Sequence, residues 1–378
     1  MESILINRVL FILGNIFLGA GFLYFVFIYI HLGLFLFPKK KVKQHSSPHN
    51  HHPISVLMIV QNEETRIEKL LSELLKQNYS KYEVVVVDNF STDHTSMILK
   101  SLSEKYSNLH FTSINQNIYF SDKQSVNLAL KAAKYEWVIF VSSDADNIPS
   151  TFLEEINNEI NGASSFYVNY SNYLPQKGKY NKICRIERFL SFINSATYSA
   201  FNISVFNQRN NVLFLKKKYF DTKPFRGKMN RYNVDLELLF NCKGKDRLIL
   251  LNKYSGATPI RENESLSKDD FYELFRKKRI LRKEFRFSQK LFMKLGTLSF
   301  LLMLLGFTEI LFLKPEIWYY ELIPFILLLI MYTAKLEIFR KRLKEIKIVL
   351  PSLLYLLIRP LVIFYFNFLS FFYYRHNR

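Results

Sequence analysis

The stretch Val141-Ser142-Ser143-Asp144-Ala145-Asp146 decides how this chain is interpreted. It follows the apolar run Trp137 to Phe140, so it marks the end of a buried strand that passes into two acidic residues. If the extended conformation continues, Asp144 and Asp146 project to the same face. Two converging carboxylates can bind Mg²⁺ or Mn²⁺, which prefer oxygen ligands. The simpler alternative is that Asp is favoured in the turn after a strand.

The sequence around this stretch alternates short β-branched runs with amphipathic segments, from Ile54 to about Ile260. That alternation is typical of βαβ units on a largely parallel sheet and predicts an α/β domain with helices on both faces. In such sheets ligands bind beyond the carboxyl ends of the strands, where the polar residues of this chain lie. We predict strands at Ile54 to Val60, Glu83 to Asp88, Leu109 to Ile114 and Trp137 to Ser142, and helices at Thr65 to Gln77 and Lys123 to Lys134.

Asp88 ends the run of valines in the second predicted strand and is followed by Asn89-Phe90-Ser91-Thr92-Asp93. A carboxylate at this place can accept hydrogen bonds from a nucleoside, as acidic residues do in other nucleotide-binding α/β folds. A helix cap or a turn is the alternative, and we adopt it for Ser91 and Asp93. For Asp88 we predict nucleoside binding.

Taken in order, these motifs resemble those of family 2 glycosyltransferases, whose catalytic domain has the GT-A fold. In that family a strand leads into a Tyr-Asn-Glu-like turn, and an acidic residue with Ser-Thr-Asp follows. A lysine with a downstream asparagine comes next, and the series ends at an Asp-x-Asp strand with a nearby proline. The matching residues here are Gln61-Asn62-Glu63-Glu64, Asp88 with Ser91-Thr92-Asp93, Lys123 with Asn127, and Asp144-Ala145-Asp146 with Pro149.

The resemblance implies roles for these residues in binding a nucleoside-diphosphate sugar. Lys123 would lie near the pyrophosphate or the sugar, and Asp144 and Asp146 would hold the sugar ribose and a divalent metal, Mg²⁺ or Mn²⁺. Gln61 replaces the usual aromatic residue, which puts base stacking there in doubt. The residues that would line the nucleotide pocket are Val60, Gln61, Glu63 and Asp88.

Asp235 is the candidate general base. Inverting enzymes need a group that removes the acceptor hydroxyl proton as that oxygen attacks the anomeric carbon. Family members often carry Glu-Asp-x-Asp-Leu there, and this chain has Val234-Asp235-Leu236-Glu237-Leu238, in which Val234 replaces the first acid. The alternative is that Asp235 stands in the first turn of a helix, where a negative charge suits the helix dipole.

Arg279 is the candidate cation for the leaving diphosphate, a role for which cationic clamps are suited. Processive relatives carry Gln-x-x-Arg-Trp on an interfacial helix, and the matching place here is Arg276-Lys277-Lys278-Arg279-Ile280. Because this segment lacks the Gln and the Trp of that motif, the sequence does not favour the synthesis of a long polymer. The alternative is a basic helix on a membrane surface.

Long apolar runs at both ends of the chain predict membrane segments. Val9 to Phe37 contains 29 residues without a formal charge, more than the roughly 20 that cross a bilayer. A cleaved signal peptide is the alternative, but the run ends in Pro38-Lys39-Lys40-Lys41 and lacks a small-residue cleavage site. The later runs are Leu295 to Leu313, Ile317 to Ala334, and Val349 to Tyr374, in which Arg359-Pro360 predicts either a kinked span or two interfacial half-helices.

The expected organisation follows from these runs and from the basic clusters that flank them. Residues 1–38 are an N-terminal transmembrane helix and 39–53 a polar linker, whose histidines we interpret as solvated rather than metal-binding. A GT-A-like domain at 54–262, a basic interfacial helical region at 263–294, and C-terminal transmembrane or interfacial helices at 295–378 complete it. Because Lys and Arg favour cytosolic loops, we expect an integral membrane protein, of a bacterial inner membrane, with a cytosolic catalytic domain.

The formal net charge of +20 could signal nucleic acid. The basic residues lie beside apolar runs and no recognition module appears, so nucleic acid is not expected as a partner. The expected function is transfer of a sugar, with inversion, from a nucleoside-diphosphate sugar to a membrane-associated acceptor, either a lipid, a lipid-linked saccharide or a glycan. A nucleotidyl or phospho-sugar transferase and a catalytically impaired membrane scaffold of a glycan-assembly system are the alternatives.

Overall fold

The computed structural model describes residues 51–115, 121–160, 164–199, 205–208, 210–221, 235–240, 248–250, 259–291 and 318–376, with position 203, positions 293–294 and short pieces before residue 24. The chain divides into two compact units. One contains residues 1–41 and 285–353, and the other contains residues 42–284 and 354–378. The predicted α/β domain lies in the second unit.

The first half of the α/β domain is a parallel sheet. The strands β1 (Ile54–Val60), β2 (Tyr82–Asn89), β3 (Leu109–Ile114) and β4 (Trp137–Phe140) lie in the order β3-β2-β1-β4, and their three pairings are parallel. The runs of β1, β2 and β4 are rich in valine and isoleucine, which suits strands that are buried on both faces, whereas β3 at the edge is more polar and mostly half-buried. The four strands predicted from the sequence are confirmed.

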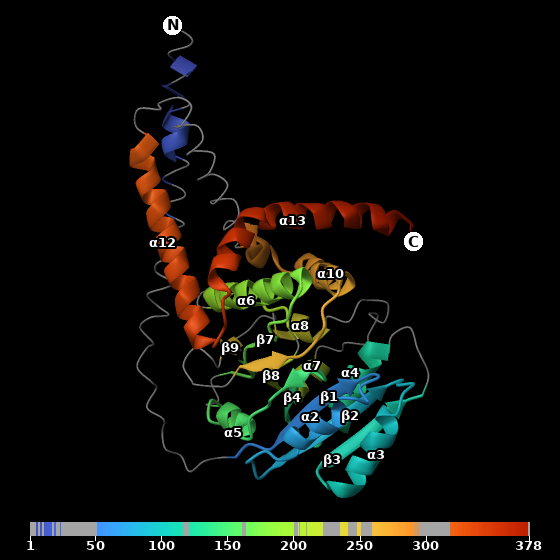
Figure 1. Ribbon diagram of the computed structural model, residues 1–378. Coiled ribbons are helices and arrows are strands. Elements are labelled where there is room, and N and C mark those ends of the chain that lie inside the picture. The colour runs from blue at the N-terminus through green and yellow to red at the C-terminus, as the bar shows by residue number, and fades with distance from the viewer. Residues whose placement is uncertain are drawn as a thin grey trace. The chain divides into compact units, whose positions relative to one another are not determined.

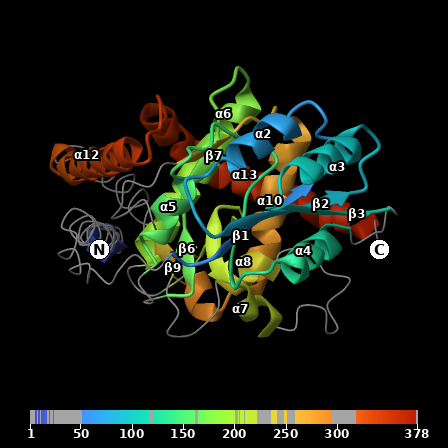
Figure 2. The same ribbon diagram turned by 90° about the horizontal axis from the view of Figure 1, so that it is seen from below.

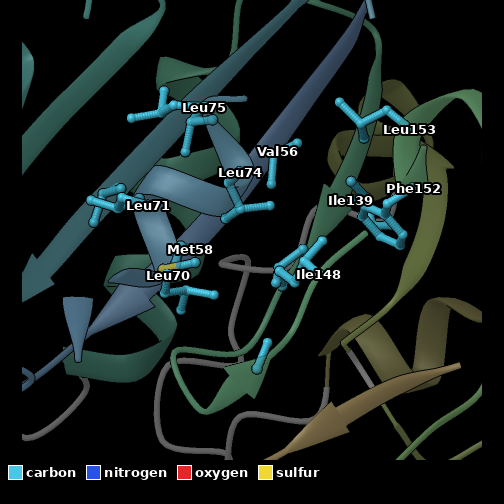
Figure 3. Close-up of a cluster of buried hydrophobic side chains, with 14 of the residues drawn as sticks. Val56, Met58, Leu70, Leu71, Leu74, Leu75, Ile139, Ile148, Phe152 and Leu153 are labelled. Atoms are coloured by element: carbon cyan, nitrogen blue, oxygen red, sulfur yellow. The ribbon is translucent and has the colours of Figure 1, made fainter. Parts of the chain in front are cut away.

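Helices cover both faces of this sheet (Figure 2), as predicted. The helices α2 (Ile67–Leu74) and α3 (Thr95–Lys105) lie on one face, and α4 (Ser121–Ala132) lies on the other. Four apolar residues of α2 are spaced along one stripe and are buried in the core. Figure 3 shows three of them, Leu70, Leu71 and Leu74, beside residues of β1, β4 and the short helix α5 (Phe152–Asn157). This core fixes α2 on one face of the sheet, and the helix begins seven residues after the end of β1. The stripe consists of Ile67, Leu70, Leu71 and Leu74.

The sheet continues beyond β4 with mixed directions. Strand β8 (Val212–Leu215) runs antiparallel to both β4 and β6 (Phe166–Val168), and β9 (Leu248–Leu250) pairs with β6 in parallel. The seven-stranded sheet is therefore mixed, with β8 as the reversed strand. A second sheet has the order β5-β10-β7 and contains the acidic stretch, because β5 is Ala145–Asp146. Its other strands are β7 (Ser171–Tyr173) and β10 (Ile260–Glu262).

Three helices of the second unit pack together beside this smaller sheet (Figure 1). The helix α6 (Lys179–Ser199) contacts α10 (Lys268–Glu284). Aromatic rings of α10 pack against Phe366 of α13 (Val349–His376), and the rings of Phe275 and Phe366 stack with centroids 4.6 Å apart. The short helices α7 (Lys216–Asp221) and α8 (Asp235–Phe240) lie between α6 and α10 along the chain.

The described residues test the predicted membrane segments only in part. The runs at 9–37 and 295–313 lie almost entirely outside them. The third run falls in α12 (Trp318–Arg342), and no single helix among the described residues is both long enough and apolar enough to cross a membrane. Val349–Leu356 and Ile358–Phe366 of α13 meet that test together and are bent by 62° at the break between them. That bend lies close to Arg359-Pro360, where a kink was predicted.

Candidate active site

The loops that follow β1 and β2 are joined by hydrogen bonds. The Oδ1 atom of Asn62 accepts a hydrogen bond from the Thr92 amide at 2.8 Å, and the Asn62 amide donates to the Ser91 hydroxyl at 2.9 Å. The Glu63 amide donates to the Thr95 hydroxyl at 2.8 Å. Asn62 has φ of 54°, in the left-handed region that Asn tolerates better than most residues. The two motifs therefore form one polar rim at the carboxyl edge of the sheet.

Asp88 lies at the centre of that rim and is paired in register with Val60. Both residues are buried. The Oδ1 atom of Asp88 accepts hydrogen bonds from the Ser91 amide at 3.1 Å and from the Ser91 hydroxyl at 2.5 Å, and its Oδ2 atom accepts one from Ser96. A carboxylate oxygen can accept more than one hydrogen bond, so Asp88 keeps capacity for a ligand while its orientation is fixed. Gln61 is exposed beside it.

Asp144 lies across the rim from this loop and is held by Arg66. The Nη2 atom of Arg66 lies 2.8 Å from Oδ1 of Asp144 and 3.0 Å from Oε2 of Glu63, and its Nη1 atom donates to the Asn263 carbonyl at 2.7 Å. Burial raises the pKa values of both carboxyls, whereas Arg66 opposes that rise. The Ser143 hydroxyl donates to the other Glu63 oxygen at 2.9 Å. Arg66 thus joins the first loop, the acidic stretch and the end of β10.

Asp146 is held by a second cation one helical turn further along α2. The Nζ atom of Lys69 lies 2.7 Å from Oδ1 of Asp146, and the Asn147 side chain donates to the other oxygen at 2.8 Å. The extended backbone expected through this stretch does not continue from β4, because residues 143–144 form a turn before β5. Arg66 and Lys69 are three residues apart, a spacing that puts both cations on one face of the helical turn. The two carboxylates therefore face the same helix.

Further charges surround Asp144 from the smaller sheet. The Nη1 atom of Arg188 lies 2.5 Å from the buried Glu262 carboxylate, and the Arg188 guanidinium lies 3.5 Å from the ring centre of Tyr173. Burial raises the pKa of Glu264 to about 7, and the neighbouring charge of Asp144 adds to that rise. The residues that surround Asp144 and Asp146 include five carboxylates and three cations, and Arg261 lies opposite Asp146 in the pairing of β10 with β5. The carboxylates are Glu63, Asp144, Asp146, Glu262 and Glu264, and the cations are Arg66, Lys69 and Arg188.

This charge balance bears on the expected Mg²⁺ or Mn²⁺. No group of three or more metal-binding side chains gathers among the described residues. Mg²⁺, however, is usually held by one or two carboxylates together with substrate phosphates, so a complete protein cage is not required. The excess of carboxylates and the oxygen chemistry of Asp144 and Asp146 fit a divalent cation. The ion pairs of Arg66 with Asp144 and of Lys69 with Asp146 must break before both carboxylates can bind a divalent cation.

Lys123 lies on α4, which packs against β1 and β2. Its side chain is 2% exposed, one of the most deeply buried lysines of the described chain. Two residues further on, the Ser125 hydroxyl donates to the Asn89 side chain at 3.0 Å, which joins α4 to the end of β2. The helix therefore brings Lys123 to the strand that carries Asp88. Its predicted contact with a pyrophosphate or a sugar stays a prediction.

Asp235 is the first residue of α8, and its side chain lies outside the described residues. Its predicted role as the base is therefore not tested. Glu237, two residues on, is buried and forms an ion pair with Lys277 of α10. Arg279 also lies on α10, and its Nη1 atom is buried without a hydrogen bond in the described part of the chain. The ion pair joins the helices that carry Asp235 and Arg279.

Several residues of this site were not predicted from the sequence. Arg66 and Lys69 follow the Gln61–Glu64 turn at helical spacing, which is also the pattern of an ordinary solvated helix face. Glu262 and Glu264 alternate in Ile260-Arg261-Glu262-Asn263-Glu264, a weak sign of a strand whose acids share one face. Only the pairing of β10 with β5, in which Glu262 lies opposite Ala145, brings these acids to Asp144.

The order of these motifs agrees with a comparison with protein families. Residues 55–227 match the model of glycosyl transferase family 2. The chain contains a glycosyl transferase family 2 domain. The match covers β1 to β8 and therefore includes the polar rim, Lys123 and the acidic pair. Asp235 and Arg279 lie beyond its end.

Curated relatives match this glycosyl transferase family 2 domain over short segments. The chain is 41% identical over 92 residues to the poly(ribitol-phosphate) β-N-acetylglucosaminyltransferase TarS of Staphylococcus aureus, which is 24% of this chain and 16% of TarS. It is 47% identical over 58 residues to the glycosyltransferase AglE of Haloferax volcanii, which is 15% of this chain and 19% of AglE. The chain thus spans less than a fifth of the length of each of these relatives.

Solved structures include a fragment of S. aureus TarS, residues 1–349, in complex with UDP-GlcNAc. It is similar to this chain with a TM-score of 0.46 and 20% sequence identity, over 77% of this chain and 88% of that one. The mannosyltransferase PcManGT of Pyrobaculum calidifontis, in complex with GDP-Man and Mn²⁺, is similar with a TM-score of 0.48 and 16% identity, over 92% and 98%.

Proposed function

We propose that this protein is an inverting glycosyltransferase that moves a sugar from a nucleoside-diphosphate sugar to a membrane-associated acceptor. The single observation that carries the proposal is the polar rim, in which the loop that binds Asp88 is bonded to the loop of Glu63, and Arg66 joins Glu63 to Asp144, inside the glycosyl transferase family 2 domain. Ligands of α/β sheets bind at this edge of the strands. The names of the relatives, which are themselves glycosyltransferases, also support it.

The donor nucleotide would bind along the rim. The Asp88 carboxylate would accept hydrogen bonds from the nucleoside, with Val60, Gln61 and Glu63 forming the surrounding wall. Lys123 would approach the diphosphate from α4. The serine hydroxyls that already bind Asp88 hold its carboxylate in place, so little ordering is needed when the nucleotide enters.

In the proposed reaction the acceptor hydroxyl attacks the anomeric carbon from the face opposite the diphosphate. The new carbon–oxygen bond forms as the bond to the diphosphate oxygen breaks, and the hydroxyl proton passes to Asp235. The electron pair of the broken bond stays on the diphosphate, and Arg279 would stabilise that charge. A divalent cation held by Asp144 and Asp146 would supply further positive charge to the departing diphosphate.

The acceptor would be a lipid, a lipid-linked saccharide or a glycan at the cytosolic face of a bacterial inner membrane. Support comes from the apolar runs at both ends of the chain and from their basic flanks. The exposed apolar residues of α13 add to it, because they form a face that suits the boundary of a bilayer. Those residues are Leu354, Ile358, Leu361, Phe364, Tyr365 and Phe368.

The test uses the full-length protein in detergent with membrane lipid extract as the acceptor source. A panel of nucleotide sugars is supplied with Mn²⁺, Mg²⁺ or chelator, and released nucleotide and glycosylated product are both measured. We expect one donor to give a nucleoside diphosphate and a glycosylated product of inverted anomeric configuration. Asp144→Asn and Asp235→Asn should reduce turnover at least 100-fold.

Asp221→Asn is the matched control, because Asp221 is an exposed residue at the end of α7, away from the rim. It should retain wild-type turnover. Release of a nucleoside monophosphate or of pyrophosphate would instead indicate phospho-sugar or nucleotidyl transfer. Folded Asp144→Asn and Asp235→Asn variants that turn over like wild type would overturn the proposal and favour a scaffold.

A further inference from the structure

A groove of about 390 Å³ lies between α6, α10 and α13 of the second unit. Its walls are mainly apolar and aromatic, and Lys268 lies among them. Leu361 and Tyr365 line the groove and are 70% and 51% exposed, so the groove is continuous with the exposed apolar face of α13. Further lining residues are Ile183, Phe271, Val362 and Phe366.

A cluster of charged side chains lies beside the groove on the same three helices. Glu187 of α6 is fully buried, and Lys278 of α10 lies 2.5 Å from its Oε2 atom. Arg359 of α13 lies 2.8 Å from the other oxygen. Arg282, one turn beyond Lys278, lies within the electrostatic reach of both Arg359 and Glu187. Lys278 and Arg359 thus both bind this one carboxylate, and Arg282 adds a third positive charge near it.

On each of the three helices, the residues that line the groove and the residues of the charged cluster occupy separate, neighbouring segments. On α6 the groove residue Ile183 precedes Glu187 by four residues, about 6 Å at 1.5 Å per residue. On α10 the groove residues precede Lys278, and on α13 they follow Arg359. The aromatic stack of Phe275 and Phe366 lies in the apolar cluster between these helices. One end of this helical layer is therefore apolar and the other is cationic.

We propose that this layer binds a lipid that ends in a phosphate monoester. The apolar groove takes the hydrocarbon chain, and the phosphate lies against Arg282 and Arg359, the two cluster cations that are not fully buried. The three positive charges of the cluster exceed the single negative charge of Glu187 by two. A phosphate monoester carries a charge of about −1.5 to −2 at neutral pH, which matches that excess. A phosphodiester headgroup carries only one charge and matches this excess less well.

If the protein is the glycosyltransferase proposed above, a lipid bound at this site is its acceptor, and the chemical class of that acceptor is a lipid phosphate. The binding itself needs neither a nucleotide sugar nor turnover. A lipid phosphate held by α10 would be bound by the helix that also carries Arg279. Binding and transfer are therefore measured separately.

The experiment is calorimetric titration of the full-length protein in a nonionic detergent, without nucleotide. Dodecyl phosphate is the probe, and inorganic phosphate, dodecyl maltoside and a short-chain phosphatidylglycerol are the comparisons. We expect saturable binding of dodecyl phosphate, at least tenfold weaker binding of phosphatidylglycerol, and none of the other two. Ile183→Trp, which fills the groove, and Arg282→Gln, which removes one cation, should each weaken dodecyl phosphate at least tenfold.

Lys283→Gln is the matched control, because it removes the same charge from an exposed position next to Arg282. It should bind dodecyl phosphate like wild type. Equal loss in Lys283→Gln and Arg282→Gln would show nonspecific attraction and overturn the proposal, and so would binding that neither Ile183→Trp nor Arg282→Gln weakens. Lipid binding without glycosyl transfer would sustain this site and contradict the proposed function, whereas glycosyl transfer without saturable binding of dodecyl phosphate would sustain the proposed function and contradict this site.

Discussion

Arg66 Nη2 lies 2.8 Å from Asp144 Oδ1, so the first acidic residue of the Asp-x-Asp pair is bound by a cation from the helix that follows β1. Lys69 binds the second acidic residue in the same way at 2.7 Å. Both cations compete with any metal ion for the same oxygens. Whether Asp144 and Asp146 bind a divalent cation therefore depends on how strongly they bind Arg66 and Lys69.

The first prediction concerns that competition. Lys69→Met removes the exposed cation from Asp146 and should tighten Mn²⁺ binding severalfold, because the metal ion no longer competes with the ammonium group for the Asp146 oxygen. Free Mn²⁺ is measured by electron paramagnetic resonance at fixed protein concentration. Lys76→Met, an exposed lysine just beyond α2, is the control and should leave Mn²⁺ affinity unchanged. Unchanged Mn²⁺ affinity in Lys69→Met would contradict the competition.

The second prediction concerns the left-handed residue of the rim. Asn62→Ala loses the acceptor for the Thr92 amide and puts an ordinary side chain at φ of 54°. We expect a loss of about 1–3 kcal/mol in the free energy of unfolding, measured with urea. Asn62→Gly keeps the backbone conformation at lower cost and should lose less than Asn62→Ala. Equal losses in the two variants would show that backbone strain does not contribute.

The third prediction concerns the buried Glu187. Burial raises the pKa of its carboxyl, but the charges of Arg359 and Lys278 outweigh burial and hold that pKa well below its usual value. A lowered pKa in the folded state stabilises the protein above the unfolded value of about 4.5, and this stability is lost as the pH falls below that value. Glu187→Gln leaves the buried Lys278 and the partly buried Arg359 without their partner and should cost about 3–5 kcal/mol near pH 7.

The measurement is urea unfolding of wild type and Glu187→Gln at pH 7 and at pH 4. The difference between the two proteins should be largest at pH 7 and should shrink as the pH falls. Glu104→Gln makes the same chemical change at an exposed position of α3 and should be neutral at both values. A pH-independent cost for Glu187→Gln would show that packing, and not charge, sets the contribution of this residue.

The strands of the parallel half could be predicted from the sequence because their apolar runs are long and are bounded by polar turns. Ile54–Val60 and Leu109–Ile114 have the bounds that were expected. The helix expected at Thr65 to Gln77 is shorter, Ile67–Leu74, because Glu63 to Arg66 form the turn that binds Asp144 and the second loop. Those contacts come from residues distant in sequence, which local periodicity does not record.

The part of the candidate site at the ends of the parallel strands could be predicted from the sequence, and the part that β10 contributes could not. Glu63 and Asp144 both contact Arg66, because each follows one of two neighbouring parallel strands, and Asp88 lies near the end of the next strand, β2. Their roles in binding a nucleotide sugar stay predictions. Glu262 and Glu264 could not be predicted, since β10 reaches the site only through its antiparallel pairing with β5. A pairing across more than a hundred residues leaves no local pattern. The roles of Asp235 and Arg279 stay predictions.

Equilibrium binding of nucleotide sugars to the polar rim tests the central claim most directly. Wild type, Asp88→Asn and the control Asp221→Asn are titrated with a panel of nucleoside-diphosphate sugars in the presence of Mn²⁺ or Mg²⁺. We predict that wild type and Asp221→Asn bind one donor with equal affinity, and that Asp88→Asn binds it at least tenfold more weakly. Wild type that binds no member of the panel, or an Asp88→Asn variant that binds as tightly as wild type, would contradict a nucleotide-sugar site at this edge of the sheet.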